Sequence, residues 1–336
     1  MKKMQNFFKR AACRNGLLPM IRSVFFVCCI FFTVIGLRAQ SRDYNHQRLL
    51  LRDEGISQLA YIDLKNPAAN WYTPIPTGRD IQLVGKGLIL VGTGNGYEEY
   101  ELATGKKVFE LNSYPGTLAA RRLRNGNTLL TGVNWQQKQG IVLVEVNAAG
   151  TVQQLINYPG FDYVRLVRET ATGNFLVTAN NVLFEGTRDG SIVWKVVIGD
   201  AQKMHAWQAL RLKNGQTVVS TGYGKNLEFF STDGKLLDTI SGPAAVNPNF
   251  FAGFQILPNG NYVVANWQGH GPKQGANGVQ VLEYTPPGKL AWSWRQDANK
   301  FSSLHAVIVL DDLDPKLLYT ENENGVLTPV KSASEK

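Results

Sequence analysis

Cysteine is scarce in this sequence and is confined to its first 29 residues. The chain of 336 residues holds only Cys13, Cys28 and Cys29. Residues 30–336 therefore carry no thiol, which excludes a disulfide scaffold, a cysteine nucleophile and a thiolate metal site from that part. Histidine is also rare, and the His-x-x-x-His spacing typical of zinc sites does not occur. We expect no bound metal.

Acidic residues are absent from the first 40 positions, which hold seven lysines and arginines. The whole chain has a formal net charge of +9. Without those seven residues the net charge falls to about +2, so the basic character belongs to the leader. Because nucleic-acid binding needs a basic surface on the folded part, this distribution predicts no nucleic-acid partner.

A long hydrophobic run is missing as well. The apolar stretch at residues 24–37 is shorter than the roughly 20 residues that a membrane-spanning helix needs. Because it follows a basic segment and precedes the small Ala39, it predicts a signal peptide over residues 1–40, with Met20 as an alternative start. We expect a periplasmic or secreted protein with no membrane span after signal removal.

What the chain does have is a repeated phrase built around an Asn-Gly pair between two apolar runs. Copies stand at 122–132, 211–222 and 256–266, with a looser copy at 169–179. Such a pair predicts a tight hairpin turn in which both residues take positive φ. A second set of glycine turns recurs every 40 to 54 residues, at Gly105, Gly150, Gly190, Gly234 and Gly288. This period is typical of four-stranded propeller blades.

The repeats predict an all-β fold, a β-propeller with six blades of four antiparallel strands. Full blades are expected at 81–115, 117–158, 161–199, 204–241 and 249–296. Three strands within 46–75 are expected to pair with one strand at 304–312, which closes the ring through the N- and C-terminal strands and removes exposed edges. A seventh blade starting at 316–322 is an alternative. The propeller domain is predicted over 41–330, before a disordered tail at 331–336.

Three segments resemble the repeats of quinoprotein-like propellers, at 100–111, 184–196 and 282–294. In that family an aromatic residue after a glycine turn joins neighbouring blades, and Phe109, Trp194 and Trp292 stand at this position. Two other units depart from the pattern, with Gln154 and Asp238 there. Members that bind a quinone cofactor typically have eight blades, a vicinal disulfide and a metal site. This chain is predicted to have fewer blades, and its mature part carries no cysteine, so we expect no cofactor.

A looser resemblance connects the chain to periplasmic aryl sulfotransferases. These are similar six-bladed propellers in which a central histidine accepts the sulfate group. The shared features are predicted export, the predicted number of blades and repeated Asn-Gly-Asn turns. The resemblance implies histidine-dependent transfer, but no local motif assigns the catalytic role to one position. Fold similarity alone does not confer a reaction.

Three histidines are predicted to meet at one mouth of the channel. His205 and His305 open first strands, and His270 lies in the loop at 266–278 between a second and a third strand. Imidazole exchanges protons near neutral pH, so the three could form a catalytic cluster. His205 is the first candidate for the nucleophilic or proton-transferring role. The alternative is that each ring hydrogen-bonds backbone at a blade junction.

Aromatic and amide residues give a second candidate site at the same mouth. Two matching Asn-Trp-Gln triplets begin at residues 134 and 266. Indole faces flanked by amides suit the stacking of an aryl group or a sugar. The alternative is that the rings are wedged between blades. The candidate ligand-binding residues are Trp135, Trp207, Trp267, Asn134, Asn266, Tyr223 and Lys225.

Two functions follow from these candidates. The first is an exported binding module or scaffold that recognises a carbohydrate, a small aromatic ligand or an envelope protein. The second is a transferase or lyase that uses His205, His270 and His305. Histidine side chains that open to the channel favour catalysis, whereas side chains that point between blades favour binding alone.

Overall fold

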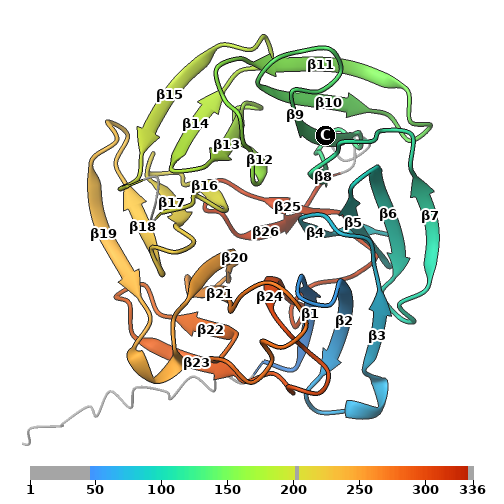
Figure 1. Cartoon of the computed structure of the whole chain (residues 1–336), viewed down its shortest axis with the longest axis vertical. Coiled ribbons are helices and arrows are strands. Elements are labelled where there is room, and N and C mark those ends of the chain that lie inside the picture. The colour runs from blue at the N-terminus through green and yellow to red at the C-terminus, as the bar shows by residue number, and fades with distance from the viewer. Residues whose placement is uncertain (1–45, 201–203, 332–336) are drawn as a thin grey trace, which may run out of the picture. The chain divides into compact units, whose positions relative to one another are not determined.

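The chain forms a six-bladed β-propeller in which six four-stranded antiparallel sheets surround a central channel (Figure 1). The computed structural model describes residues 46–200 and 204–331. The predicted signal peptide, its two possible starts, the three cysteines and tail residues 332–336 lie outside the described residues. The predicted fold class is therefore confirmed.

Blades 1 to 5 use their strands in chain order from the channel outward, and two short 3₁₀ helices lie in connections between the described strands. Blade 1 is β4 (Ile81–Gly85), β5 (Leu88–Thr93), β6 (Gly96–Glu101) and β7 (Lys107–Leu111), and blade 2 is β8 (Ala119–Arg122), β9 (Thr128–Val133), β10 (Ile141–Val146) and β11 (Val152–Tyr158). Blade 3 is β12 (Val167–Glu169), β13 (Phe175–Ala179), β14 (Val182–Gly186) and β15 (Ile192–Val197), and blade 4 is β16 (Ala209–Arg211), β17 (Thr217–Ser220), β18 (Asn226–Phe230) and β19 (Leu236–Ser241). Blade 5 is β20 (Phe250–Ile256), β21 (Tyr262–Trp267), β22 (Val281–Tyr284) and β23 (Leu290–Trp294), and the helices are η1 (Pro67–Ala69) and η2 (Ala244–Val246).

Blade 6 closes the ring as predicted. Its sheet order is β24 (Leu304–Val309), β1 (Arg48–Asp53), β2 (Gln58–Asp63) and β3 (Trp71–Pro74). The C-terminal strand β24 is the innermost strand and pairs antiparallel with β1. Apolar side chains of neighbouring blades pack together, and one cluster joins Leu50 and Ile308 of blade 6 to Ile81 and Ile89 of blade 1. The ring therefore leaves no first or last blade with an uncovered face.

In blades 2, 4 and 5 the hairpin between the first and second strands lies at an Asn-Gly pair, but its geometry differs from the prediction. Only the glycine takes positive φ, 87° at Gly126 and 79° at Gly215. The preceding asparagines instead accept a backbone N–H two residues on, as when Asn125 Oδ1 bonds the Asn127 amide at 3.0 Å. The turn is a type I turn followed by a left-handed glycine, which suits a three-residue loop. The expectation of two positive φ values was wrong at these pairs.

The asparagine at the third position of the repeated Asn-Gly-Asn turns has its own role. In blades 2, 3 and 5 this side chain, or its equivalent, donates to a glutamate of the third strand. The donor and acceptor pairs are Asn127–Glu145 at 2.7 Å, Asn174–Glu185 at 2.8 Å and Asn261–Glu283 at 2.6 Å. A hydrogen bond to a charged group contributes about 1.5–3 kcal/mol. The repeat therefore stabilises these three blades by fixing the inner hairpin to the third strand.

Two of the three aromatic residues in the quinoprotein-like pattern do connect blades. Trp194 Nε1 of blade 3 donates to the Thr232 carbonyl of blade 4 at 2.9 Å. The ring of Trp292 in blade 5 lies edge-on to His46, which precedes β1, with 4.7 Å between ring centroids. The Phe109 ring instead lies 5.6 Å from Tyr97 of its own blade and is 38% exposed.

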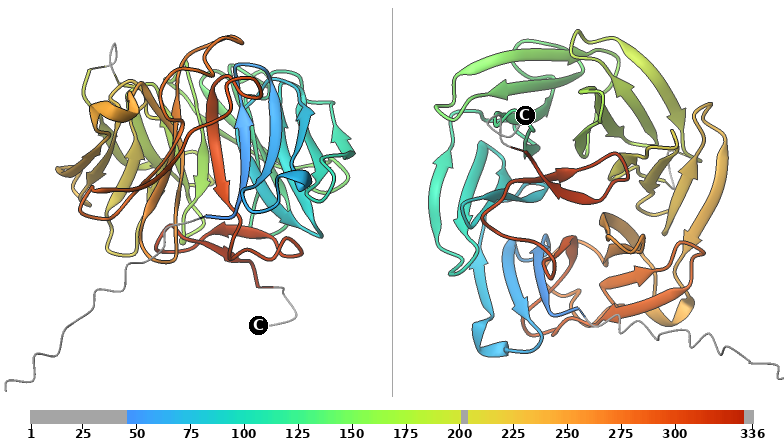
Figure 2. Two further views of the ribbon diagram at one scale, coloured as in Figure 1. Left: turned by 90° about the horizontal axis from the view of Figure 1, so that it is seen from below. Right: turned by 180° about the vertical axis from the view of Figure 1, so that it is seen from behind.

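The two faces of the ring carry different loops. We call the upper face the one with loops that lead into first strands and loops that join second to third strands. The lower face carries the hairpins between first and second strands. On this lower face β25 (Tyr319–Glu321) and β26 (Leu327–Pro329) form a two-stranded hairpin that crosses the end of the channel (Figure 2).

This hairpin, the plug, replaces the seventh blade that residues 316–322 could have started. Its strands pair with each other, and Gln82 Nε2 of blade 1 donates to the Tyr319 carbonyl at 2.9 Å. A single bridge also joins Val326 to Ile256 of blade 5. Strands of three residues that contact the inner strands of two different blades do not form a further sheet radiating from the channel. The alternative of seven blades was wrong.

An ionic layer joins the plug to the inner strands of the ring and contains two arginines and two carboxylates. Arg168 contacts Asp80 at 2.6 Å and Glu321 at 3.1 Å. Arg121 contacts Asp80 at 3.3 Å and Glu321 at 2.6 Å. The two arginines lower the pKa of the buried Glu321 carboxyl to about 2, although burial by itself raises it. Every charge in this layer thus has an opposite charge within contact.

Candidate functional site

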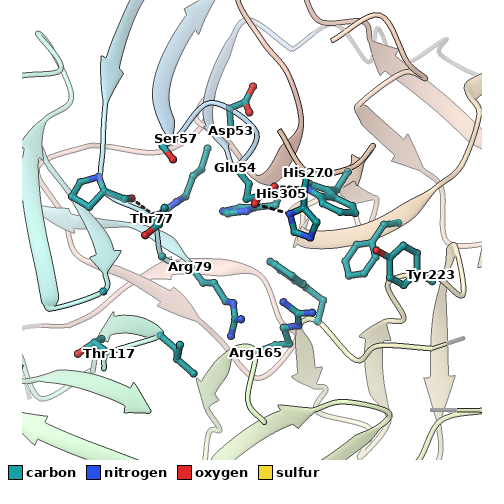
Figure 3. Close-up of a pocket in the computed structure, with 18 residues that line it drawn as sticks. Asp53, Glu54, Ser57, Thr77, Arg79, Thr117, Arg165, Tyr223, His270 and His305 are labelled. Atoms are coloured by element: carbon teal, nitrogen blue, oxygen red, sulfur yellow. Dashed lines mark hydrogen bonds and ion pairs between the residues drawn. The ribbon is translucent and has the colours of Figure 1, made fainter. Parts of the chain in front are cut away.

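A cavity of about 300 Å³ occupies the upper end of the channel (Figure 3). Loops of all six blades surround it, because both kinds of upper loop converge there. Its charged and aromatic lining residues are Arg52, Asp53, Glu54, Arg79, Arg165, Trp207, Tyr223, Phe250, Trp267, His270 and His305. The plug lies at the other end of the channel, so the cavity opens only through the upper face.

Arg79 and Arg165 reach into the cavity from the loops that lead into β4 and β12 (Figure 3). The Arg165 guanidinium lies over two rings, 4.6 Å from the Tyr163 centroid and 4.8 Å from Trp207. Arg79 donates to the Tyr163 hydroxyl at 3.2 Å and to the Val164 carbonyl. Burial, followed by the neighbouring Arg79, lowers the pKa of Arg165 to about 10.

Arg52 adds a third cation beneath them. Its guanidinium is buried and donates to the backbone carbonyls of Asp80, Gly92 and Pro76 at 2.9–3.0 Å. Burial lowers the pKa of Arg52 to about 10. Neutral carbonyl dipoles thus satisfy the donors of this arginine without cancelling its charge.

His305 is a deeply buried polar side chain of the lining. It is 2% exposed, and neither ring nitrogen has a hydrogen-bond partner. Burial, together with Arg52, Arg79 and Arg165, holds the pKa of His305 well below its ordinary value of 6.5. The imidazole is therefore neutral at pH 7 and offers the cavity one N–H donor and one lone pair.

Glu54 and His270 form an exposed pair at the rim. His270 Nδ1 lies 2.8 Å from Glu54 Oε1, and its side chain is 78% exposed. Trp267 Nε1 donates to the other carboxylate oxygen of Glu54 at 2.9 Å. The carboxylate thus orients the imidazole, the arrangement that general acid–base catalysis uses.

Four aromatic side chains form a continuous wall on the side of blades 4 and 5. The Phe250 ring is at the centre, with centroids 5.5 Å from Trp207, 4.8 Å from Tyr223 and 5.3 Å from Trp267. All three contacts are edge-to-face, which is a favourable geometry for aromatic pairs. The cavity therefore has a cationic side and an aromatic side.

Five of the ten predicted site residues line this cavity, namely His270, His305, Trp207, Trp267 and Tyr223. His205, the first catalytic candidate, does not. Its ring lies edge-on to Tyr223 at 5.4 Å, and its Nδ1 is buried without a partner. The structure thus brings two of the three histidines to the cavity and leaves His205 behind the aromatic wall.

The other four candidates have local structural contacts instead. Trp135 Nε1 donates to the Pro115 carbonyl at 2.7 Å, and Asn134 Oδ1 accepts the Gly140 amide at 2.9 Å within a loop. Asn266 is fully buried and donates to the Asn247 and Val279 carbonyls at 3.2 and 3.0 Å. Lys225 is exposed in a tight turn outside the lining.

The arginines were missed by the sequence analysis, although the repeat marks two of them. Arg79, Leu118, Arg165 and Trp207 each stand eight residues before the glycine of an inner hairpin. All four line the cavity, because this position is just before the innermost strand at the upper face. Aligning the repeats on their glycines would have identified both arginines.

The part of the chain that the structure describes holds no cluster of three or more His, Cys, Asp or Glu side chains suited to a metal ion. Over those same residues, no helix has the length and hydropathy required to span a membrane. Both observations concern residues 46–200 and 204–331 alone.

Neither the family models nor the curated proteins include a match to this chain. Among solved structures, a protein of unknown function from Bacteroides caccae is 21% identical with a TM-score of 0.62, covering 78% of this chain and 98% of that one. Regucalcin from Agrobacterium tumefaciens, described as a calcium-binding protein, is 14% identical with a TM-score of 0.52 over 78% and 95%. Virginiamycin B lyase from Staphylococcus aureus is 12% identical with a TM-score of 0.50 over 75% and 83%. These similarities show the propeller fold.

Proposed function

We propose that this chain is an exported binding propeller that takes up a small aromatic ligand through its upper face. The observation that carries the proposal is the wall of Trp207, Tyr223, Phe250 and Trp267 beside a cavity closed at its lower end. A cavity of about 300 Å³ is at the lower limit for small-molecule sites. An envelope protein or a long glycan would need a more open surface, so this site favours a compact ligand.

The proposed location and the proposed kinship of the chain rest on its sequence. The basic and apolar leader supports a periplasmic or secreted location. The glycine-and-aromatic repeats support kinship with quinoprotein-like propellers, without their cofactor. The similar folds include, by their names, a calcium-binding protein and a lyase, so the scaffold accommodates both binding and catalysis.

Loss of one indole from the wall provides the test. Trp207→Leu removes a ring that lines the cavity, and we expect 2-naphthol to bind at least about tenfold more weakly. Trp135→Leu is the matched control, because Trp135 is equally buried on the upper face but lies outside the cavity. Isothermal titration calorimetry measures both affinities. No binding of aromatic compounds to the wild-type protein, or equal losses in the two variants, would reject the proposal.

A histidine-dependent transferase or lyase is the second candidate function. It is favoured by the orientation of His270 by Glu54 near the neutral His305. In sulfuryl transfer, a nitrogen of His305 would attack sulfur and break the aryl O–S bond, while His270 gives the leaving phenolate a proton. A second phenol would then return a proton to His270 while its oxygen takes the sulfuryl group, which breaks the S–N bond and frees His305.

An assay of sulfuryl transfer between an aryl sulfate and a phenol tests this candidate. The geometry predicts that His305→Ala abolishes turnover, whereas His205→Ala retains most of it, which reverses the order expected from the sequence. Absence of turnover by the wild-type protein leaves binding as the function.

A further inference from the structure

The upper cavity contains more positive than negative charge, in contrast to the other buried arginine groups of the ring. Arg121 and Arg168 each contact two carboxylates. Arg79 and Arg165 contact none within the described residues, and their polar partners are a hydroxyl, a carbonyl and aromatic faces. Burial lowers the pKa of both guanidinium groups, which shows that the folded protein holds their charge at a disadvantage.

The two carboxylates of the lining are already engaged. Asp53 accepts the backbone amide of Ser303 at 2.9 Å and that of Ser302. Glu54 accepts from Trp267 and pairs with His270. Neither is in contact with Arg79 or Arg165, so the charge of these arginines is left for something that enters the cavity.

His305 points to the same conclusion by an independent route. A buried polar atom without a partner is costly, and here both ring nitrogens are in that state. A neutral imidazole can donate its N–H to an anion, whereas the three neighbouring arginines repel a cation. The His305 N–H without a partner and the guanidinium groups without a carboxylate therefore both favour an anionic group in the cavity.

The position of these groups also orients the ligand. His305 is fully enclosed, whereas Tyr223 and His270 are exposed at the rim. Figure 3 shows Arg79 and Arg165 directed into the space that His305 and His270 face from the other side. A charged group would lie deep in the cavity, and an attached ring would extend along the aromatic wall toward the opening.

We infer that the ligand is an aromatic oxyanion, such as an aryl carboxylate or sulfonate, whose oxygens are held by Arg79, Arg165 and His305. This inference rests on the proposed function and adds the charge of the ligand. Guanidinium groups match the geometry of such oxyanions and form stronger hydrogen bonds with charged than with neutral acceptors.

Three probes of similar shape separate the inference from the proposed function. They are 2-naphthoate, naphthalene-2-sulfonate and the neutral 2-naphthamide, titrated by calorimetry at low salt. We expect both anions to bind at least about tenfold more tightly than the amide, with the preference decreasing as salt rises. Equal affinity for all three probes would overturn the oxyanion inference alone. Binding of none would overturn the proposed function.

Substitutions of the arginines test which residues cause the preference for anionic probes. Arg165→Gln and Arg79→Gln should each remove most of this preference while 2-naphthamide still binds. Lys138→Gln is the matched control, because it removes one positive charge from an exposed upper loop outside the cavity, and it should retain the full preference. Arg165→Lys keeps the positive charge. It is a second variant in which the preference for anionic probes can be measured if Arg165→Gln is unstable. Survival of the full preference in both arginine variants would overturn the inference.

Discussion

Two arginines lie at each end of the channel, but only those at the lower end have carboxylate partners among the described residues. At the lower end Arg121 and Arg168 are paired with Asp80 and Glu321, and the plug that carries Glu321 seals the ring. At the upper end Arg79 and Arg165 have no carboxylate partner among the described residues, and the cavity is open. The paired arginines contact the plug, whereas the arginines without a carboxylate partner face the cavity that we propose as a binding site.

Removing the plug's carboxylate should cause the largest effect. Glu321→Gln leaves two buried arginines with only Asp80 between them, and breaking a buried ion pair in this way costs about 3–5 kcal/mol. We expect the free energy of unfolding in urea to fall by that amount at pH 7. Glu323→Gln in the same hairpin is the control, because its pair with Lys213 is exposed. Equal losses in the two variants would show that the ionic layer does not hold the plug.

A pH titration should reveal a second paired cation of the lower end. His46 lies 2.9 Å from Glu283 and 3.2 Å from Asp311, and despite its burial these carboxylates raise the pKa of His46 to about 9. Since the unfolded value is near 6.5, the stabilisation is complete below pH 6.5 and is lost as pH rises through 9. Its size is on the order of 2–3 kcal/mol.

The measurement is the unfolding free energy of the wild-type protein and of His46→Gln between pH 6 and pH 10. We expect the wild-type advantage to shrink toward high pH. An advantage that is constant with pH would mean that His46 is neutral in the folded protein.

Loss of an upper arginine should have the smallest effect on stability. Arg165→Gln removes stacking on Trp207, which contributes roughly 0.5–1 kcal/mol, but also relieves repulsion from Arg79. We expect the unfolding free energy to change by less than about 1 kcal/mol. A loss as large as that of Glu321→Gln would contradict the distinction between the two ends.

The sequence predicted the ring well because the propeller is encoded locally. Each inner hairpin has its own glycine, and the turns recur at a regular spacing. The number of blades and the closure of the ring can therefore be predicted from that spacing. The plug was not predictable in this way. Its strands of three residues lack an internal repeat, and its position depends on Glu321 meeting Arg121 and Arg168, which are distant in sequence.

The site was predicted less completely, for a related reason. Loop position correctly indicated that His270 and His305 lie on the upper face, but it does not indicate the direction of a side chain. His205 stands two residues before Trp207, and it is Trp207 that faces the cavity while His205 packs against Tyr223. Arginine does not titrate near neutral pH, so its residue type alone does not mark it as an acid–base candidate.

A crystal structure of the protein with naphthalene-2-sulfonate would show where the cavity holds the charge of a ligand. We expect the sulfonate to lie within hydrogen-bond distance of Arg79, Arg165 and His305, with the naphthalene against Trp207 and Trp267. Anomalous scattering from the sulfur would locate it without reference to the protein side chains. A sulfonate bound elsewhere, or a cavity that stays without ligand at saturating concentration, would contradict the account.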